Sequence, residues 1–583
     1  MMQNIKRLCP ILYIYTFNCY AIHARLFVIG GKEMRSREGT TQGDPTAMVD
    51  YAIGLQPLLM ALSKPAKKPK HVAYADDLTG GGKLLELRSW FDLIVTEGPM
   101  FGYDAEPTKS WLVVKENLFE DAKHIFKDTG VNITVQGKKH LGAVIGQIEY
   151  KNEFMSDLIQ GWVEQIHYLS EIAKFEPQAA YIAFTTGLRH KYTYYMRTIP
   201  RINGLLKPLE SAICYKLIPA LTEGRKCTDD ERMLLSLPVR LGGMGIINPV
   251  LIADNEYDNS KKATHLLSEA IIDQQLSLPA NLEIKSKKAK SEIRSERRKL
   301  QDVQLQNLRS RMTPDELRTN DIACQSKTSN WLTTLPIEEN GFSLTKRKFW
   351  DALSLRYGWT LKRLPAVCAC GDRFDLSHAL SCKKGGFVLK RHNELRDLTA
   401  NLLNEVCNDV CVEPVLHELT GESMKYKTSN ISSDARLDIS ARGVWTNGQK
   451  AFFDVRVFDP LARKYNGQSL SQCYRTNENE KKRIYGQRVL QIENGSFTPL
   501  VFNALGGMGT ECAIFYKRLS IMLAEKRNLR QSMVANWINT KLSFAILRSA
   551  LLCIRGSRHR YHKSIIAETD IDIVVKESGI RSV

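Results

Sequence analysis

The order of apolar and polar positions predicts alternating helical and strand segments. Residues 91–135 mix both periods, whereas residues 150–235 place apolar side chains at three- and four-residue steps, as at Trp162, Ile166 and Leu169, which is typical of amphipathic helices. Farther on, the pattern predicts helix, strands, helix, strand and helix, at residues 387–411, 435–440 and 451–458, 477–492, 499–503 and from 510 onward. We therefore expect a multidomain chain with α+β and α/β parts.

A short apolar run, His71–Tyr74, leads into Asp76 and Asp77, which Leu78 and Thr79 and three glycines follow. This pattern predicts a strand that turns sharply, with both carboxylates at the tip of a hairpin. Adjacent carboxylates suit Mg²⁺, which takes oxygen ligands, and pairs of such ions serve phosphoryl transfer. A solvated turn is the alternative, and the dipeptide alone favours it.

Further motifs flank this hairpin. The sequence EGTTQGDP at residues 38–45 precedes it, and Phe101-Gly102-Tyr103, Thr108-Lys109 and His140-Leu141-Gly142 follow. In this order and spacing they resemble the palm of reverse transcriptases of non-LTR retrotransposons. The resemblance implies that Asp76 and Asp77 bind catalytic metal ions, Gln42 and Gly43 line the nucleotide and template pocket, Lys109 faces the incoming triphosphate, and Leu141-Gly142 belongs to a hairpin that grips the primer.

One catalytic residue of that family is missing. The family supplies another aspartate upstream of the Gln-Gly pair, but residues 1–43 contain no aspartate, only Glu33 and Glu38. A two-metal site without a bridging carboxylate loses metal affinity and charge stabilisation together. We therefore expect this chain by itself not to polymerise DNA, and we interpret it as truncated at its start.

The composition narrows the class of partner. A chain of 583 residues with 43% hydrophobic residues can bury more than one core, so we expect three or four domains. The net charge of +19 and the pI near 9.2 indicate a polyanionic partner, DNA and RNA rather than anionic lipid. Thirteen scattered cysteines suit a reducing compartment. We expect an intracellular protein of nucleus or cytoplasm that is not secreted.

The first apolar stretch, residues 8–22, follows Lys6-Arg7 and superficially resembles a signal peptide. Pro10 and Asn18 interrupt it. We interpret it as a leftover strand or as an artefact of the assumed translation start. Because the chain has no run of eighteen apolar residues, we expect no membrane partner.

Basic side chains recur in the helical region and after it. Arg189, Lys191 and Arg197 are interleaved with tyrosines; we expect the tyrosines to pack in a core and the basic face to meet a duplex, as in the thumb of the resembled family. Eight basic residues then predict a long basic helix: Lys285, Lys287, Lys288, Lys290, Arg294, Arg297, Arg298 and Lys299. For that helix, contact with phosphates and a face exposed only to solvent are two interpretations that we weigh equally.

Four soft ligands lie within fifteen residues: Cys368, Cys370, His378 and Cys382. Three thiolates and an imidazole match a closed, structural, tetrahedral zinc site. A set of buried thiols is the alternative. A knuckle of similar order is found in retrotransposon proteins between polymerase and endonuclease.

The predicted strands near the carboxyl end carry Asp438 and Asp454, and a charged pair, Asp454 and Arg456, interrupts an otherwise apolar strand. Such charges are costly to bury unless a cation or partner satisfies them. The pattern resembles the PD-(D/E)xK restriction-endonuclease-like domain of site-specific non-LTR retrotransposons. The resemblance implies that Asp438 and Asp454 bind Mg²⁺ or Mn²⁺ and that a lysine assists the attacking water.

This motif departs from the family at two positions. Arg456 stands in place of the lysine and cannot act as a base, and Leu437 stands in place of a proline. The next predicted helix carries Lys481, Lys482 and Tyr485, where related endonucleases have a displaced lysine ahead of a tyrosine. We expect Lys481 or Lys482 to assist catalysis and Arg456 and Tyr485 to contact substrate. The alternative is an inert core with a structural contact between Asp454 and Arg456.

Together, these features predict a truncated retrotransposon protein with a DNA-nicking activity or, as the alternative, a non-catalytic nucleic-acid-binding remnant of one. The resemblance covers most of residues 24–525. The segments expected are a partial palm (1–149), a helical thumb (150–254), a basic helical linker (255–330), a zinc-knuckle region (331–386), a restriction-endonuclease-like domain (387–555) and a tail (556–583).

Overall fold

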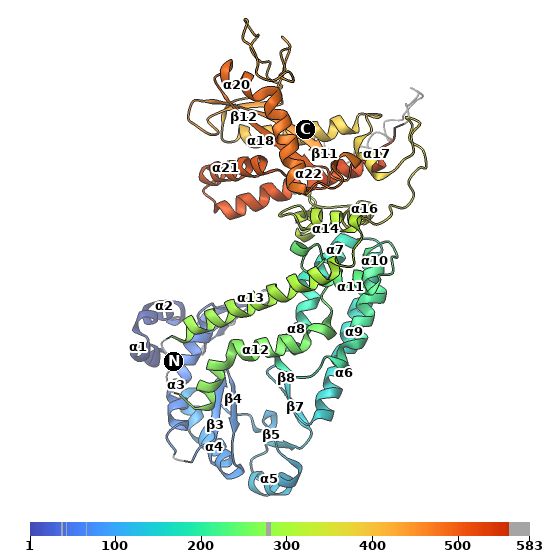
Figure 1. The fold of residues 1–583 in the computed structure, drawn as a ribbon. Coiled ribbons are helices and arrows are strands. Elements are labelled where there is room, and N and C mark those ends of the chain that lie inside the picture. Colours follow the sequence, from blue (N-terminus) through green and yellow to red (C-terminus); the bar gives the residue numbers. More distant parts are fainter. Residues whose placement is uncertain (29, 37–38, 42, 66, 276–280, 559–583) are drawn as a thin grey trace. The chain divides into compact units, whose positions relative to one another are not determined.

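The chain is described by a computed structural model that covers residues 1–28, 30–36, 39–41, 43–65, 67–275 and 281–558. It consists of helices and small sheets (Figure 1), as expected for a multidomain α+β protein. Two compact units form, one from residues 1–159, 194–205 and 253–296 and the other from the rest of the chain. The six segment boundaries expected from the sequence stay a prediction.

The first unit contains short helices and two-stranded sheets. Its elements are α1 (Met2–Leu8), α2 (Pro10–Tyr20), β1 (Ala24–Val28), β2 (Lys32–Ser36), α3 (Ala47–Leu62), β3 (Lys70–Tyr74), β4 (Asp77–Gly81), α4 (Leu84–Glu97), β5 (Trp111–Val113), α5 (Phe119–Phe126), β6 (Asn132–Thr134), β7 (Gly137–His140) and β8 (Ala143–Gly146). Helix α6 (Ile148–Ala173) starts in this unit and ends in the other, and α12 (Pro249–Ile272) lies mostly in this unit.

Strands β3 and β4 form the hairpin that the sequence predicts. They pair antiparallel, and the Tyr74–Asp77 pair closes a turn of Ala75 and Asp76. Ala75 has a φ of 54°, a left-handed conformation that a tight turn requires. Leu141 and Gly142 likewise form the turn between β7 and β8, which pair antiparallel from His140 and Ala143. Both predicted turns are thus confirmed as hairpins.

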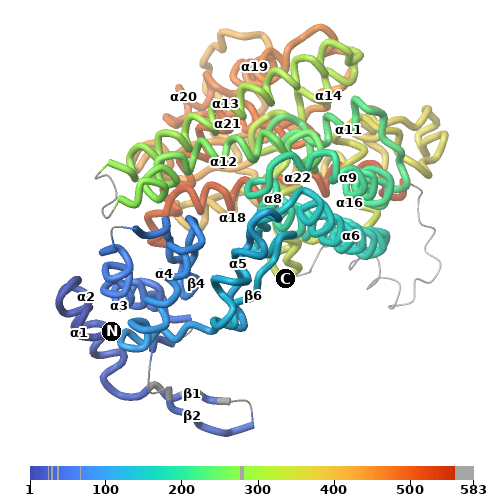
Figure 2. Tube along the Cα trace, turned by 90° about the horizontal axis from the view of Figure 1, so that it is seen from below, coloured from blue at the N-terminus to red at the C-terminus, as the bar shows by residue number. Residues whose placement is uncertain are grey.

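The residues of the apparent signal peptide are helical, so the interpretation as a leftover strand is wrong. Pro10 is the first residue of α2, where a proline is tolerated because that position needs no donor. Helices α1, α2 and α3 pack together (Figure 2). The buried Asp50 of α3 accepts a hydrogen bond from Thr16 Oγ1 at 3.1 Å, which fixes α2 against α3.

The basic run forms a single helix, α13 (Leu282–Arg309), of 28 residues. Leu305 and Leu308 near its end are buried in a small cluster with Leu237 and Leu241. Its first part lies beside α12 (Figures 1 and 2), where Lys262 and Glu296 form an ion pair at 3.3 Å. The predicted long basic helix is confirmed, and most of its basic side chains are exposed.

The second unit contains the rest of the helices and one larger sheet. Its elements are α7 (Pro177–Ala183), α8 (Arg189–Thr198, of which the last residues belong to the first unit), α9 (Lys207–Ala212), α10 (Ile218–Leu221), α11 (Asp229–Ser236), α14 (Pro314–Cys324), α15 (Asn330–Thr333), α16 (Lys346–Tyr357), α17 (Leu376–Ser381), α18 (Phe387–Asn404), β9 (Asn408–Val412), β10 (Ile439–Arg442), β11 (Lys450–Phe458), α19 (Leu470–Lys481), α20 (Gln487–Gln491), β12 (Ser496–Asn503), α21 (Thr510–Arg527) and α22 (Gln531–Arg555).

The tyrosines of the helical region include core residues, as expected. Tyr181 and Tyr192 are buried, and the Tyr181 hydroxyl donates to the Met244 carbonyl at 2.6 Å. The glycines that follow permit a tight backbone path: a Cβ at Gly243 would meet the Leu237 carbonyl oxygen at 1.9 Å, so no larger residue fits there.

The sheet of the second unit has the strand order β12-β11-β10-β9. Strands β11 and β12 are parallel, whereas β10 pairs antiparallel with both β11 and β9. Helices α18, α21 and α22 cover the face that Phe453, Val455 and Phe502 share, and α19 packs with Phe458 and Val501. The predicted order of helix, strands, helix, strand and helix is confirmed.

Two element boundaries differ from the prediction. The helix expected to reach residue 411 ends at Asn404, and residues 408–412 form strand β9 instead. This strand has the sequence NDVCV, whose β-branched valines fit an edge strand. Strand β10 begins at Ile439 rather than at Ala435, because residues 435–437 pack in a loop against Phe452.

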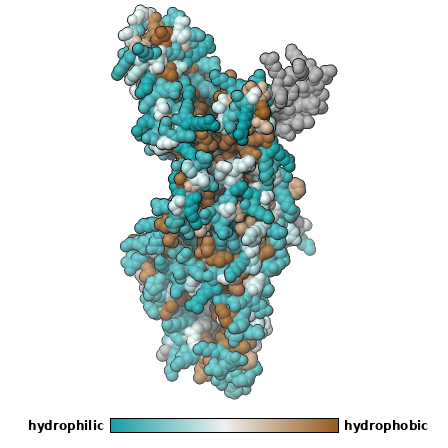
Figure 3. All heavy atoms as spheres, turned by 45° about the vertical axis from the view of Figure 1, so that its right-hand side comes forward, coloured by the Kyte–Doolittle hydropathy of each residue, from teal (hydrophilic) through white to brown (hydrophobic). Residues whose placement is uncertain are grey.

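Among the residues described, helix α22 is the one helix whose length and apolar composition would let it cross a membrane. However, 72% of its most apolar 18-residue stretch is buried within the fold. Its side chains form much of the core between α18 and α21, which accounts for its composition. Figure 3 shows a face of the protein on which hydrophilic side chains predominate and apolar ones form scattered patches.

Candidate metal and carboxylate sites

The four soft ligands predicted from the sequence lie together. The ligand atoms of Cys368, Cys370, His378 and Cys382 are all within 4.8 Å of one another. The Cys382 sulfur lies 3.9 Å from the sulfurs of both Cys368 and Cys370, and the Cys370 sulfur lies 3.3 Å from His378 Nε2. This group can hold a metal ion.

The backbone around the group explains why these residues converge. Gly371 has a φ of 100°, which lets the chain reverse after Cys370, and the Cys368 amide donates to the Asp372 carbonyl at 2.8 Å. Asp375 caps α17 by accepting from the His378 amide at 2.8 Å. Residue His378 therefore sits in the first turn of a fixed helix that faces the cysteine turn.

The spacing is compatible with zinc. Two sulfurs that are each about 2.3 Å from one ion at a tetrahedral angle are about 3.8 Å apart, which matches the two sulfur distances of 3.9 Å. A disulfide needs about 2.05 Å, and all thirteen cysteines are free. Cys370 is exposed, which does not fit the alternative of buried thiols alone.

Asp438 lies directly before β10, next to the strand that carries Asp454. The antiparallel register pairs Ile439 with Phe453, the Asp438 amide donates to the Phe453 carbonyl at 3.2 Å, and Asp438 Oδ2 accepts from the Val455 amide at 2.5 Å. Asp438 therefore contacts both residues that flank Asp454. The charge of Asp438 accordingly contributes to the raised pKa of Asp454.

Asp454 is a buried carboxylate, only 5% exposed. Burial raises its pKa to about 6, the Lys481 ammonium opposes this shift, and Asp438 reinforces it. The Lys481 Nζ lies 2.7 Å from Asp454 Oδ2 and forms an ion pair with it. The buried carboxylate thus already has one cation beside it, and a metal ion would lie next to the Lys481 ammonium.

The other predicted residues of this site differ in their contacts. Arg456 lies 3.9 Å from Glu480 Oε2, so the structural contact between Asp454 and Arg456 that we weighed as an alternative is replaced by the Asp454–Lys481 pair. Lys482 forms an ion pair with Glu511. The Lys481 ammonium lies 5.7 Å from the centre of the Tyr485 ring. Only Lys481 of the two lysines touches an aspartate of the site.

Residues 482–486, which follow Lys481, form a π turn. Such turns interrupt α-helices frequently at functional sites. Here the turn ends α19 directly after the lysine that reaches Asp454 and carries Tyr485 toward Phe497, whose ring centre lies 6.0 Å away.

His392 of α18 was missed by the sequence patterns. Its Nε2 lies 3.1 Å from Asp438 Oδ2, and the same oxygen accepts the Val455 amide at 2.5 Å. Burial lowers the pKa of His392, but the hydrogen bond and charge of Asp438 outweigh it and raise the pKa overall. No motif spacing links His392 to Asp438, because the contact arises from helix-on-sheet packing.

The hairpin carboxylates are more open. Asp76 and Asp77 are exposed, as is Lys109, and Gly43 has a φ of 93°. Gln42 lies outside the described residues. In the part of the chain that the structure covers, the cysteine and histidine group is the one set of three or more metal-binding side chains close enough to share an ion, so neither pair of aspartates is joined by a third carboxylate.

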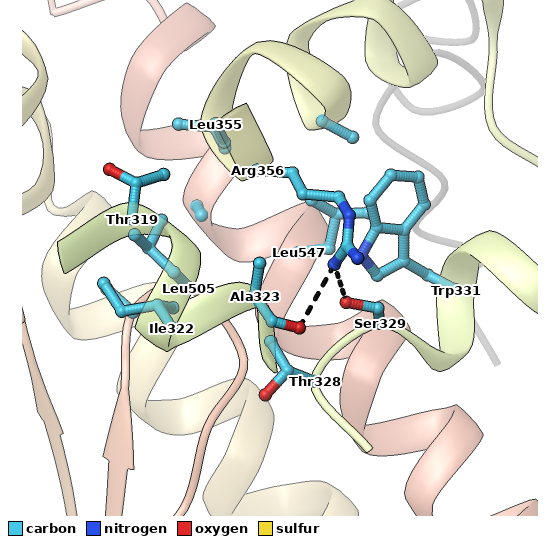
Figure 4. A pocket seen from close by; sticks show the side chains of 13 residues that line it. Thr319, Ile322, Ala323, Thr328, Ser329, Trp331, Leu355, Arg356, Leu505 and Leu547 are labelled. Carbon is cyan, nitrogen blue, oxygen red and sulfur yellow. Dashed lines mark hydrogen bonds between the residues drawn. The ribbon is translucent and has the colours of Figure 1, made fainter. Parts of the chain in front are cut away.

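A small cavity of about 30 Å³ lies beside the buried Arg356 in the second unit (Figure 4). The Arg356 guanidinium donates to Ser329 Oγ and to the Ala323 carbonyl, and it also reaches the carbonyls of Val239 at 3.0 Å and Gly243 at 3.1 Å. A water needs about 10–15 Å³, so the space suits one or two waters rather than a substrate. We interpret Arg356 as a structural residue.

No protein-family model matches this chain, and a search of curated proteins finds no significant match.

Proposed function

We propose that this protein derives from a non-LTR retrotransposon of the site-specific type and that residues 387–555 form a divalent-metal-dependent endonuclease that nicks DNA. The observation that carries the proposal is the placement of Asp438, directly before β10, against the residues that flank Asp454 on β11, with Lys481 at 2.7 Å from Asp454. Two carboxylates can bind Mg²⁺ together with a substrate phosphate, and such an ion can catalyse phosphodiester hydrolysis.

Asp438 and Asp454 would hold Mg²⁺ or Mn²⁺, since carboxylate oxygens are the ligands that these ions prefer. The bound ion would polarise the scissile phosphate and lower the pKa of a bound water. Lys481 places an ammonium next to Asp454, where it can orient the attacking water. Arg456 is partly exposed and, with Tyr485, fits contact with the substrate backbone.

For the amino-terminal part, we propose a palm like that of reverse transcriptases that does not extend DNA by itself. Asp76 and Asp77 at the hairpin tip, with Gln42, Gly43 and Lys109, would be its metal and nucleotide residues. The exposed hairpin and the lack of a third carboxylate near it among the described residues support the proposal of a polymerase without activity, because two-metal catalysis needs bridging ligands.

DNA and RNA are the proposed partners, and nucleus or cytoplasm the proposed location. The exposed basic residues of α13 support this, since phosphates are the usual partners of such a surface. We also propose that the cysteine and histidine group holds a structural Zn²⁺.

A nicking assay tests the endonuclease. Supercoiled plasmid is incubated with the full chain in Mg²⁺, with Asp454→Ala and Asp438→Ala compared with the unchanged protein. We expect open-circle product from the unchanged protein and none above background from either variant. Equal nicking by Asp454→Ala would reject the proposal, because a contaminating nuclease would then explain the product.

A non-catalytic nucleic-acid-binding remnant is the second candidate. The hydrogen bond between His392 and Asp438 and the ion pair between Lys481 and Asp454 favour it, because both carboxylates have partners within the protein. Binding of oligonucleotides without any metal-dependent nicking would support this candidate.

A further inference from the structure

A groove of about 670 Å³ lies in the second unit, apart from the residues assigned above. It is bounded by the loop after α14, the start of α21 and the start of α22. Its size falls within the range of about 300–1,000 Å³ that ligand sites occupy.

The lining of the groove is basic and apolar. Lys327 and Lys517 are its charged residues, and no carboxylate is among the described residues that line it. Neither ammonium forms an ion pair within the described part of the chain. Met508 and Ile514 contribute apolar surface, and Ile514 is 54% exposed. The groove therefore favours an occupant with both carboxylates and apolar side chains.

A segment of the same chain has this composition. Residues 559–583 lie outside the described residues, and residues 568–575 have the sequence ETDIDIVV. Residues 565–578 hold four carboxylates and one lysine, a net charge of −3. If that segment is extended, Glu568, Asp570 and Asp572 share one side and Ile571 and Ile573 share the other, because side chains alternate along an extended chain.

The segment is long enough to reach the groove. Asn539, the groove residue of α22 nearest to the end of that helix, is sixteen residues before Arg555, or about 24 Å at about 1.5 Å per residue. Glu568 is ten positions after Arg558, a distance of at most about 33 Å when the chain is extended. The stretch between Arg558 and Glu568 is therefore long enough to cover that distance.

We propose that the acidic tail segment, residues 568–577, docks in this groove, with its carboxylates against Lys327 and Lys517 and its isoleucines against Met508 and Ile514. Attachment to α22 gives the segment an effective concentration of about millimolar, so weak contacts suffice. A nucleic-acid strand would satisfy the lysines but leave the apolar lining uncovered. This inference does not depend on the proposed nuclease.

Carbodiimide cross-linking of the full chain tests the proposal, because it joins a lysine and a carboxylate only where they are in contact. Peptide mapping should find links from Lys327 or Lys517 to Glu568, Asp570, Asp572 or Glu577. The yield of links from the tail to the groove segments should fall about tenfold in a Lys327→Glu, Lys517→Glu variant. It should return when Asp570→Lys and Asp572→Lys are added, since the reversed charges pair again.

The matched control is Lys425→Glu, Lys427→Glu, which changes the same charge at two exposed lysines of the same unit and should leave the links unchanged. The yield should also be independent of protein concentration. Three results would each overturn the proposal. The tail could link to all exposed lysines alike, or the links could occur only between two copies of the chain. Finally, no links could form at all while the Lys327→Glu, Lys517→Glu variant loses oligonucleotide binding.

Discussion

At the scale of residues, the central feature is a carboxylate placed where water hardly reaches it. Asp454 lies in the middle of β11 with apolar neighbours on both sides, Phe453 and Val455, both buried. Burial of an ionised carboxylate costs free energy unless an opposite charge is close. Lys481 supplies that charge through its ion pair with Asp454 Oδ2 at 2.7 Å.

The raised pKa of Asp454 predicts a pH-dependent stability. Its pKa of about 6 in the folded chain exceeds the value of about 3.9 for an unfolded chain. Its contribution to stability is therefore present below about pH 4 and is lost as the pH rises through about 6. The test is thermal unfolding without divalent ions. The Tm of the Asp454→Asn variant minus the Tm of the unchanged protein should increase from about pH 4 to about pH 7.5. A difference that does not change with pH would contradict the burial of this charge.

Two adjacent lysines offer a matched comparison. Lys481 is 16% exposed and lies 2.7 Å from Asp454, whereas Lys482 is 46% exposed and pairs with Glu511. We expect Lys481→Ala to lower the plasmid-nicking rate by about 100-fold or more, as loss of a group that positions a proton does. The Lys482→Ala variant should stay within about threefold of the unchanged rate. Equal losses would show that Lys481 has no special role.

Sequence patterns predicted some of these residues and not others. The cysteine and histidine spacing was sufficient, because all four ligands come from one short segment. Asp438 and Asp454 could be singled out as charges in apolar strands. The contact of His392 with Asp438 joins residues 46 positions apart, and only the packing of α18 on the sheet decides it.

At the scale of elements, the cysteine and histidine group is tied to the strand that carries Asp454. Ser377, next to His378, donates to Asp459 Oδ2 at 2.7 Å, and Asp459 follows the last residue of β11. Arg558 donates to the Ala379 carbonyl at 3.1 Å and stacks on Phe374. Loss of metal from the group should therefore loosen α17 and the end of β11 together.

Removal of a ligand tests that coupling. Cys382→Ser should remove bound zinc and lower the Tm of the second unit by about 2–3 °C, the shift expected for about 2 kcal/mol in a unit of this size. Cys411→Ser is the control, because Cys411 is exposed and outside the group. If the Cys382→Ser protein binds no zinc and its Tm is unchanged, the metal at this group does not stabilise the fold.

Element order was predictable where the apolar pattern was strong, and boundaries were less so. Residues 406–412 read as a continuation of α18, since apolar side chains at 406 and 410 keep a helical step. Pairing with β10 makes the last part a strand, and such a distant partner is invisible in a local pattern. The helix at residues 10–20 was missed because its tyrosines and isoleucines suit strands equally.

At the scale of the whole molecule, the positive charge is the dominant feature. Helix α13 contains nine basic and four acidic residues, a net charge of +5. Its basic side chains at Lys288, Lys290, Arg294 and Arg298 are exposed. The fold of the two units could be expected only as a class, because no local signal states how separate segments assemble into each unit.

The charge of α13 predicts a salt-dependent affinity for nucleic acid. Replacing Lys288, Lys290, Arg294 and Arg298 by alanine should weaken binding to a duplex. The slope of log affinity against log salt should fall by about 0.9 for each phosphate that the helix no longer neutralises, up to about 3.6. Fluorescence anisotropy at several salt concentrations measures this slope.

Alanine at Lys123 and Lys127 of the α5 region, which are also exposed, is the control and should have a smaller effect on the slope. An unchanged slope in the α13 variant would assign α13 to the solvated face that we weighed as its alternative.

The central claim is that Asp438 and Asp454 share a divalent ion, and Mn²⁺ binding measured by electron paramagnetic resonance tests it most directly. The full chain is used with Asp76→Asn and Asp77→Asn, so that the hairpin carboxylates do not contribute. We predict a bound Mn²⁺ that is lost on adding either Asp438→Asn or Asp454→Asn and kept on adding Asp409→Asn, an exposed aspartate of β9. Unchanged Mn²⁺ binding in the Asp438→Asn and Asp454→Asn variants would contradict the claim.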